Sequence, residues 1–208
     1  MTRRRSAALV AIALAAPLLA AAASPPAPAA PPGPADVPAG HYVLDKRHAA
    51  LIARVMHMGV SLYTLRFNTL DASFDYDPKR PEATRLEASV DPASLDVNAD
   101  YGKQFAEEFL SASKFPKATF ASTAVTNAGN GQGTVTGDLT LMGVTKPVTF
   151  NVTLTGSAHE VLPLPVGRRA AGFEATATIK RSDFGSTYLN NLVGDDVQLE
   201  ITAEFEKK

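Results

Sequence analysis

The chain has 208 residues, with 20 basic and 21 acidic side chains and no cysteine or tryptophan. This charge balance gives no support to a nucleic-acid partner. Without cysteine there is no disulfide framework, so the hydrophobic core alone must stabilise the fold.

The first 23 residues have the organisation of a secretory signal. Arginines at positions 3–5 form a positive n-region, a short apolar stretch follows, and small residues precede Ser24. The stretch is short and interrupted by Pro17, which favours a cleaved signal over an uncleaved anchor. Its removal takes three basic and no acidic residues, so the net charge falls from −1 to −4. We expect a periplasmic protein; Sec and twin-arginine export are not distinguished.

Residues 24–40 are almost entirely alanine, proline and glycine. Such a segment is expected to be an extended, semi-rigid linker. Residues 41–208 then form one domain, which is long enough to bury its own core.

Most of this domain alternates apolar and polar residues with a period of two, which predicts strands with one wet and one dry face. Asn130-Gly131 predicts a two-residue hairpin turn, and Asp77-Pro78 and Asp91-Pro92 predict further turns. The alternating stretches are 70–76, 86–90, 134–141, 148–155, 173–180 and 197–206.

One segment follows a helical period instead. Tyr101, Phe105 and Phe109 recur every four residues, and Asp100 is the expected N-cap. The fold class is therefore all-β, with about eight antiparallel strands and one short helix. Such strands bury their dry faces by closing into a barrel or by pairing two sheets.

The strand at residues 50–58 is apolar on both faces. Ile52, Met56 and Met58 lie on the face opposite Leu51 and Val55. Either the helix or a second subunit could cover the additional face, so a homodimer is one possibility.

An outer-membrane barrel would need aromatic girdles at both interfaces. The chain has no tryptophan, its other aromatic residues do not cluster at strand ends, and it ends in Glu206-Lys207-Lys208. We therefore expect a barrel with an apolar interior and no stable membrane insertion.

The residues that could carry chemistry do not form a recognisable motif. The four histidines show no metal-ligand spacing, and no serine lies in a nucleophile-elbow motif. The glycines at 129–133 form a hairpin tip, not a phosphate loop. We expect no catalytic residue, no metal site and no cofactor.

Longer motifs indicate a family. The motifs are, in chain order, Tyr42-Val43-Leu44-Asp45 with His48, His57-Met58-Gly59, Phe115 to Phe120, Gly137 to Val148, Lys180 to Gly185 and Val193 to Val197. These segments resemble those of the YceI-like family of exported lipid-binding proteins. The resemblance implies an extended, lipocalin-like, eight-stranded barrel whose interior takes a polyisoprenoid, a quinone or another long-chain amphiphile.

The chain departs from the family pattern in several places. Ala49 stands where the family often has serine, Ala53 where it often has an aromatic residue, and Leu65 where it often has glycine. The arginine typical of the segment before the helix's Leu110 is absent, since residues 98–104 offer only Lys103. If that arginine holds a charged head group, this protein prefers a neutral lipid such as a quinone.

The candidate ligand-binding residues come from the strand faces expected to point inward and from one strand end. For each apolar residue, plain core packing is an equal alternative. His57 is expected on the inward face, either as a satisfied core histidine or as a head-group contact. Arg181 and Asp183 form either a turn with a local ion pair or a polar anchor at the barrel mouth. The set is Leu51, Ala53, Val55, His57, Phe74, Leu86, Phe150, Val152, Phe173, Ile179, Arg181, Asp183 and Phe184.

The expected function is a periplasmic binding protein that carries or sequesters the lipid. Two alternatives remain at this point. One is an enzyme acting on an isoprenoid-type lipid, and the other is a stress-related structural protein whose core is filled by its own side chains.

Overall fold

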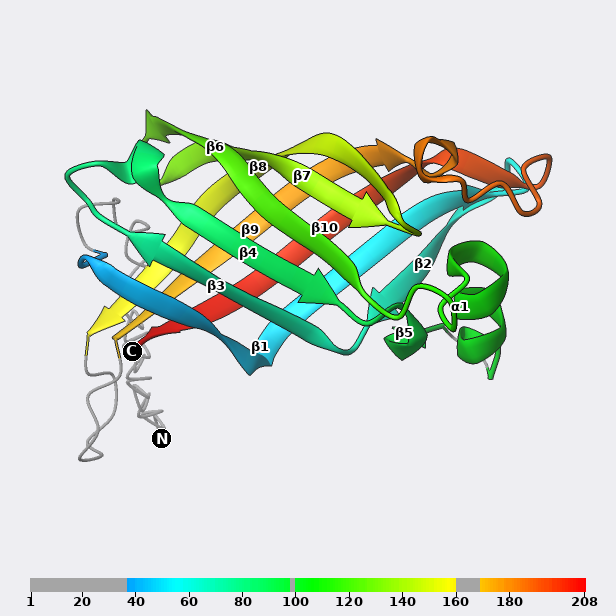
Figure 1. The fold of residues 1–208 in the computed structure, drawn as a ribbon, viewed down its shortest axis with the longest axis horizontal. Coiled ribbons are helices and arrows are strands. Elements are labelled where there is room, and N and C mark those ends of the chain that lie inside the picture. The colour runs from blue at the N-terminus through cyan, green and yellow to red at the C-terminus, as the bar shows by residue number, and fades with distance from the viewer. Residues whose placement is uncertain (1–36, 98–99, 160–168) are drawn as a thin grey trace, which may run out of the picture. The chain divides into compact units, whose positions relative to one another are not determined.

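The computed structural model describes residues 37–97, 100–159 and 169–208 (Figure 1). The predicted signal at 1–23 and most of the predicted linker lie outside these residues. The α-helix is α1 (Gly102–Leu110), and short 3-10 turns are η2 (Pro81–Ala83), η3 (Pro92–Ser94) and η4 (Arg181–Phe184). The strands are β1 (Gly40–His57), β2 (Ser61–Phe67), β3 (Leu70–Tyr76), β4 (Arg85–Val90), β5 (Leu95–Asp96), β6 (Ala118–Gly129), β7 (Gln132–Leu141), β8 (Val144–His159), β9 (Arg169–Lys180) and β10 (Val193–Lys207).

The strands close into an antiparallel barrel. Eight of the ten strands lie in the order β10-β9-β8-β7-β6-β4-β3-β1, and β10 also pairs with β1, which closes the barrel; β2 and β5 continue the sheet beyond β1. Figure 1 shows these eight strands inclined around one long axis. The expected all-β barrel with one helix is confirmed, and closure explains how every dry strand face is buried.

Strand β1 runs the whole length of the barrel and pairs with β10 on one side. On its other side it pairs first with β3 and then with β2. β2 and β3 therefore act as two halves of one interrupted strand. The register with β10 shifts between Leu44 and Ala49, so residues 45–48 form a bulge in β1.

Asp45 holds this bulge together. Its carboxylate accepts hydrogen bonds from the backbone N–H of Arg47 at 3.0 Å and from the Arg47 guanidinium at 2.8 Å. Its Oδ2 also lies 3.0 Å from Nδ1 of His48. The side-chain hydrogen bond from Arg47 is the largest cause that lowers the pKa of Asp45 well below its ordinary value.

The hairpin between β6 and β7 turns on Asn130 and Gly131, as predicted. Both residues have positive φ, 52° and 73°. A two-residue hairpin turn whose twist matches that of its strands requires positive φ at both positions. Asparagine and glycine adopt this conformation most readily.

The helix α1 covers β5 and the neighbouring end of β2. Ala106 is buried with Leu95, Val97 and Ala112, and Phe105 packs on this cluster. The N-cap is Tyr101, without a side-chain cap bond, so the prediction that Asp100 is the N-cap is wrong. The helix does not cover Met56 and Met58, whose side chains are exposed.

Candidate functional site

The barrel interior contains an apolar cavity of about 320 Å³. Strands from around the whole barrel contribute side chains to its wall. The leucine, isoleucine, valine and phenylalanine residues that line it are Val37, Leu44, Leu51, Leu70, Phe74, Leu86, Val90, Phe120, Val125, Val135, Leu139, Phe150, Val152, Leu154, Phe173, Leu199, Ile201 and Phe205.

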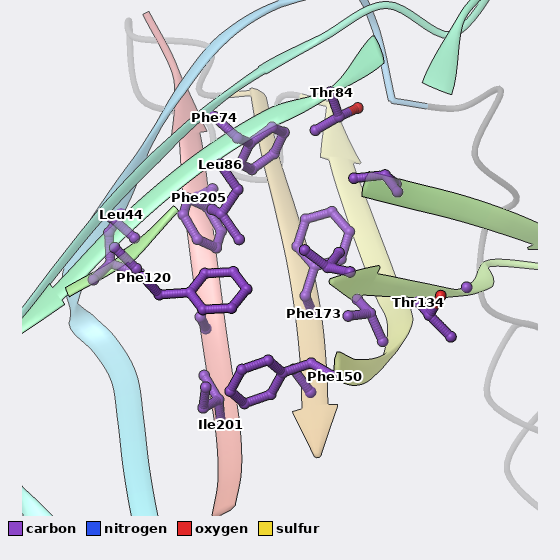
Figure 2. A pocket seen from close by; sticks show the side chains of 18 of the residues that line it. Leu44, Phe74, Thr84, Leu86, Phe120, Thr134, Phe150, Phe173, Ile201 and Phe205 are labelled. Atoms are coloured by element: carbon purple, nitrogen blue, oxygen red, sulfur yellow. The ribbon is translucent and has the colours of Figure 1, made fainter. Parts of the chain in front are cut away.

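Phenylalanine rings form much of the wall (Figure 2). Phe74 lies edge-on to Phe173 at 5.8 Å and to Phe205 at 5.0 Å between ring centroids. Phe120 and Phe150 make a second edge-to-face pair at 5.3 Å. Such pairs hold the rings in place, so the wall is built in advance of any ligand.

Polar residues line the cavity in two places. Asp71, Ser89 and Thr119 are paired neighbours on β3, β4 and β6. The other group lies at the end that we call the mouth. Thr84 directly follows η2. Asn127, Gln132 and Thr134 come from the β6–β7 hairpin. Figure 2 shows Thr84 and Thr134 set apart from the rings of Phe120 and Phe150. The residues that line the mouth offer hydroxyl and amide groups, and the charged segment at residues 77–82 lies beside them.

Only two ionisable side chains occur among the described lining residues, Asp71 and Tyr76. Asp71 is exposed and its carboxylate lies 3.0 Å from the ammonium group of Lys46. Burial, as the main cause, raises the pKa of the Tyr76 hydroxyl. The described wall therefore carries no basic group that faces a ligand.

The opposite end of the barrel is filled by side chains. Phe184 is 2% exposed and belongs to a packed cluster with Val148 and Ile179, and none of these three residues lines the cavity. We call this the closed end.

Arg181 lies in the closed end and is 6% exposed. Its Nε donates to the carbonyl of Gly194, its Nη1 to those of Ser186 and Tyr188, and its Nη2 to that of Val193, each at 2.9 Å. Burial lowers the pKa of the guanidinium, which is nevertheless the most basic side chain in proteins. Arg181 therefore ties the loop after η4 to the start of β10, where it is remote from the mouth.

Six of the thirteen predicted ligand-binding residues line the cavity: Leu51, Phe74, Leu86, Phe150, Val152 and Phe173. Ala53 and Val55 are buried further along β1, and Ile179 and Phe184 pack in the closed end, so these four are core residues outside the cavity wall.

Two expectations for the polar candidates are corrected: the inward orientation of His57 and the ion pair between Arg181 and Asp183. His57 is exposed rather than inward, and its ring lies 5.9 Å from that of Tyr63. Asp183 is exposed. Arg181 hydrogen-bonds to backbone carbonyls rather than forming an ion pair with Asp183.

Several wall residues were missed although their strands were recognised. Leu154, Ile201 and Phe205 follow the same alternation as the predicted residues and could have been included. Leu44 could not, because the bulge changes which face of β1 points inward.

The described residues contain no group of three or more histidine, cysteine, aspartate or glutamate side chains placed to hold a metal ion. In the same part of the chain, no helix is long and apolar enough to cross a membrane.

Solved structures share this fold. The chain superposes on BcnA of Burkholderia cenocepacia with a TM-score of 0.68 and 26% identity, over 77% of this chain and 98% of that one. The YceI protein of Campylobacter jejuni gives 0.63 and 27%, over 74% and 90%. A polyisoprenoid binding domain from Saccharophagus degradans gives 0.60 at 14% identity, over 80% and 98%, which shows the shared fold alone.

The sequence itself has close relatives. It is 34% identical over 212 residues to a UPF0312 protein of Shewanella putrefaciens, which covers 100% of both chains. It is 40% identical over 170 residues to a UPF0312 protein of Yersinia enterocolitica, over 80% of this chain and 86% of that protein. The YceI-like domain profile matches residues 42–205. The motifs, the barrel and these matches agree, and the chain belongs to the YceI-like family.

Proposed function

We propose that this protein binds a long-chain isoprenoid or a similar amphiphilic lipid inside its barrel and carries or sequesters it in the periplasm without altering it. The observation that carries the proposal is the cavity, which is apolar along its wall, polar at its mouth and filled at the opposite end. Water finds few hydrogen-bond partners in such a space. Each buried CH₂ of a lipid tail, in contrast, contributes about 0.8 kcal/mol to the free energy of binding.

The arrangement favours a ligand that is inserted with its tail first. The tail would pack on Phe120, Phe150 and Leu199, and the head would remain beside Thr84 and Gln132. Because no basic side chain is among the described residues that line the cavity, a neutral head such as an alcohol or a quinone carbonyl is favoured over a diphosphate.

The enzyme alternative would need acid, base or nucleophile groups that converge on one point in the cavity. Asp71 and Tyr76 are the ionisable groups of the described lining, and Asp71 already lies against Lys46. The filled-core alternative does not account for about 320 Å³ of apolar space. The polyisoprenoid binding domain of Saccharophagus degradans, which shares the fold, supports a lipid ligand.

The periplasmic location rests on the predicted signal at residues 1–23. Cell fractionation of a tagged chain tests this part separately. Recovery from the cytoplasm of intact cells would contradict it and leave the lipid-binding proposal standing.

Native mass spectrometry of the purified protein, followed by solvent extraction, tests lipid binding. We expect additional mass that is released by organic solvent and identified as a long-chain lipid. An unliganded protein that takes up no added polyprenol or quinone would contradict the proposal.

A further inference from the structure

The exposed large hydrophobic side chains of the described residues all lie on three neighbouring segments. These are the β1–β2 turn, the loop between η4 and β10, and the start of α1. Figure 1 places all three at the end of the barrel away from the β6–β7 hairpin. We call this surface the apolar tip; its residues are Met56, Met58, Val60, Leu62, Tyr101, Tyr188, Leu189 and Leu192.

The segments of the apolar tip are fixed to one another. The backbone N–H of Met58 donates to the carbonyl of Leu192 at 2.6 Å. Ring contacts then run from Tyr101 to Phe105 at 5.9 Å, from Phe105 to Phe109 at 5.8 Å and from Phe109 to Tyr188 at 5.1 Å. The apolar tip is therefore a built surface rather than a set of unrelated exposed residues.

Two of its residues adopt an unusual backbone. Met58 has φ 53° and Leu189 has φ 50°, in the left-handed region where glycine or asparagine is favoured. Each turn keeps a large apolar residue at a position that costs conformational energy. Strain of this kind is associated with functional sites.

The segments at the two ends of the barrel differ in their content of charged residues. Residues 56–62 and 186–192 contain no aspartate, glutamate, lysine or arginine. The β3–β4 connection near the mouth has the sequence Asp77-Pro78-Lys79-Arg80-Pro81-Glu82. The two turns of the apolar tip are thus free of formal charge, whereas Asp100 and Lys103 flank Tyr101 in its third segment and four charged side chains lie beside the mouth.

We propose that the apolar tip binds reversibly to the surface of a lipid bilayer with neutral head groups. Apolar side chains would enter the interface, and the half-exposed rings of Tyr101 and Tyr188 would lie at head-group level, where tyrosine is favoured. The absence of lysine and arginine from the two turns argues against electrostatic attraction to an anionic surface.

The shape of the apolar tip favours a bilayer over a second copy of the chain. Val60 is 83% exposed at the apex of its turn, and a Cβ built on Gly59 would have no atom within 4 Å. Two projecting turns bury little area against each other, whereas a stable dimer needs a broad matched surface. A projecting apolar residue can enter a bilayer without a complementary pocket on a partner. This proposal does not depend on the identity of any lipid in the cavity.

The chain has no cysteine, so a single introduced cysteine can be labelled specifically. Val60→Cys in the apolar tip and Lys79→Cys near the mouth are each labelled with an environment-sensitive dye and mixed with phosphatidylcholine vesicles. We expect a blue shift, and quenching by lipid-borne quenchers, at position 60 and not at 79. Each dye reports its own surroundings, so binding through the N-terminal segment does not mimic this pattern. No change at position 60, or equal changes at both positions, would overturn the proposal.

A series of variants tests whether the apolar side chains of the tip cause the response to vesicles. Adding Met58→Ser and Leu192→Ser to the position-60 label should weaken the vesicle response at least tenfold, whereas adding the exposed-site changes Ala83→Ser and Ala124→Ser should not. Unchanged response in the first pair would overturn the proposal. A shift at position 60 that appears without vesicles, together with doubled mass in light scattering, would show instead that a second copy covers the apolar tip.

Discussion

Leu44 and Ala49 both line the cavity although five positions separate them in β1. In a regular strand, residues an odd number apart point to opposite faces. Leu44 is paired with Phe205 and Ala49 with Ala203, so five steps along β1 match two along β10. The bulge at residues 45–48 therefore allows both halves of β1 to contribute to the cavity wall.

Asp45→Asn should loosen this bulge and lower the free energy of unfolding by about 1 kcal/mol, because the ion pair with the exposed Arg47 is lost. Chemical denaturation measures the change. Asp75→Asn is the matched control, since Asp75 is exposed and bonded to His41 at 2.9 Å, and it should change stability by less than about 0.5 kcal/mol. Equal effects of the two variants would show that Asp45 does not hold the bulge.

The same carboxylate gives a pH dependence. The pKa of Asp45 is lower in the folded chain than its ordinary value of 3.8, so its contribution is present above about pH 4. It is lost as the pH falls below that value towards the folded-state pKa. Thermal melts from pH 7 to pH 2 should show a smaller acid-induced loss in Asp45→Asn than in the unmodified chain. Parallel curves would contradict this assignment.

Arg181→Ala should destabilise the barrel by about 3 kcal/mol or more, because four backbone carbonyls lose a buried donor. Arg181→Lys should recover only part of the loss, because lysine lacks the planar fork. Lipid affinity of the folded fraction should be unchanged, since Arg181 lies in the closed end.

The control for Arg181 is Arg54→Ala. Arg54 pairs with Glu200 on the barrel exterior, and loss of that pair should cost no more than about 1 kcal/mol. Preserved stability with weakened lipid binding in Arg181→Ala would restore the role of Arg181 as a polar anchor.

Ala53→Phe distinguishes the core from the cavity wall. Ala53 is buried in β1 but does not line the cavity, so the added ring has no space and should destabilise the fold by about 1–3 kcal/mol. Lipid affinity should change little. A stabilised variant with weaker lipid binding would show that the cavity extends to this residue.

The sequence predicted the strands well because one-sided burial in a closed barrel imposes a period of two. It also predicted the Asn130-Gly131 hairpin, where the turn needs positive φ at both positions. The bulge of β1 and the interruption between β2 and β3 could not be predicted, because they depend on pairing between distant segments.

The site was predicted only in part for related reasons. The alternation of apolar and polar residues shows that Ala53 and Phe150 point to the interior of the barrel. It does not show which of the two lines the cavity. Burial of Arg181 depends on carbonyls of residues 186–194 that fold back over it. The outward turn of His57 follows from its place at the end of β1, where the barrel wall stops.

The central claim is that the cavity holds a lipid tail, and Ala175 and Thr176 provide its most direct test. Ala175 lines the cavity, whereas the next residue, Thr176, is exposed. Titration with a fluorescent long-chain polyprenol should show affinity at least tenfold weaker for Ala175→Phe, which corresponds to about 1.4 kcal/mol, and unchanged affinity for Thr176→Phe. Equal affinities in two folded variants would contradict binding in the cavity.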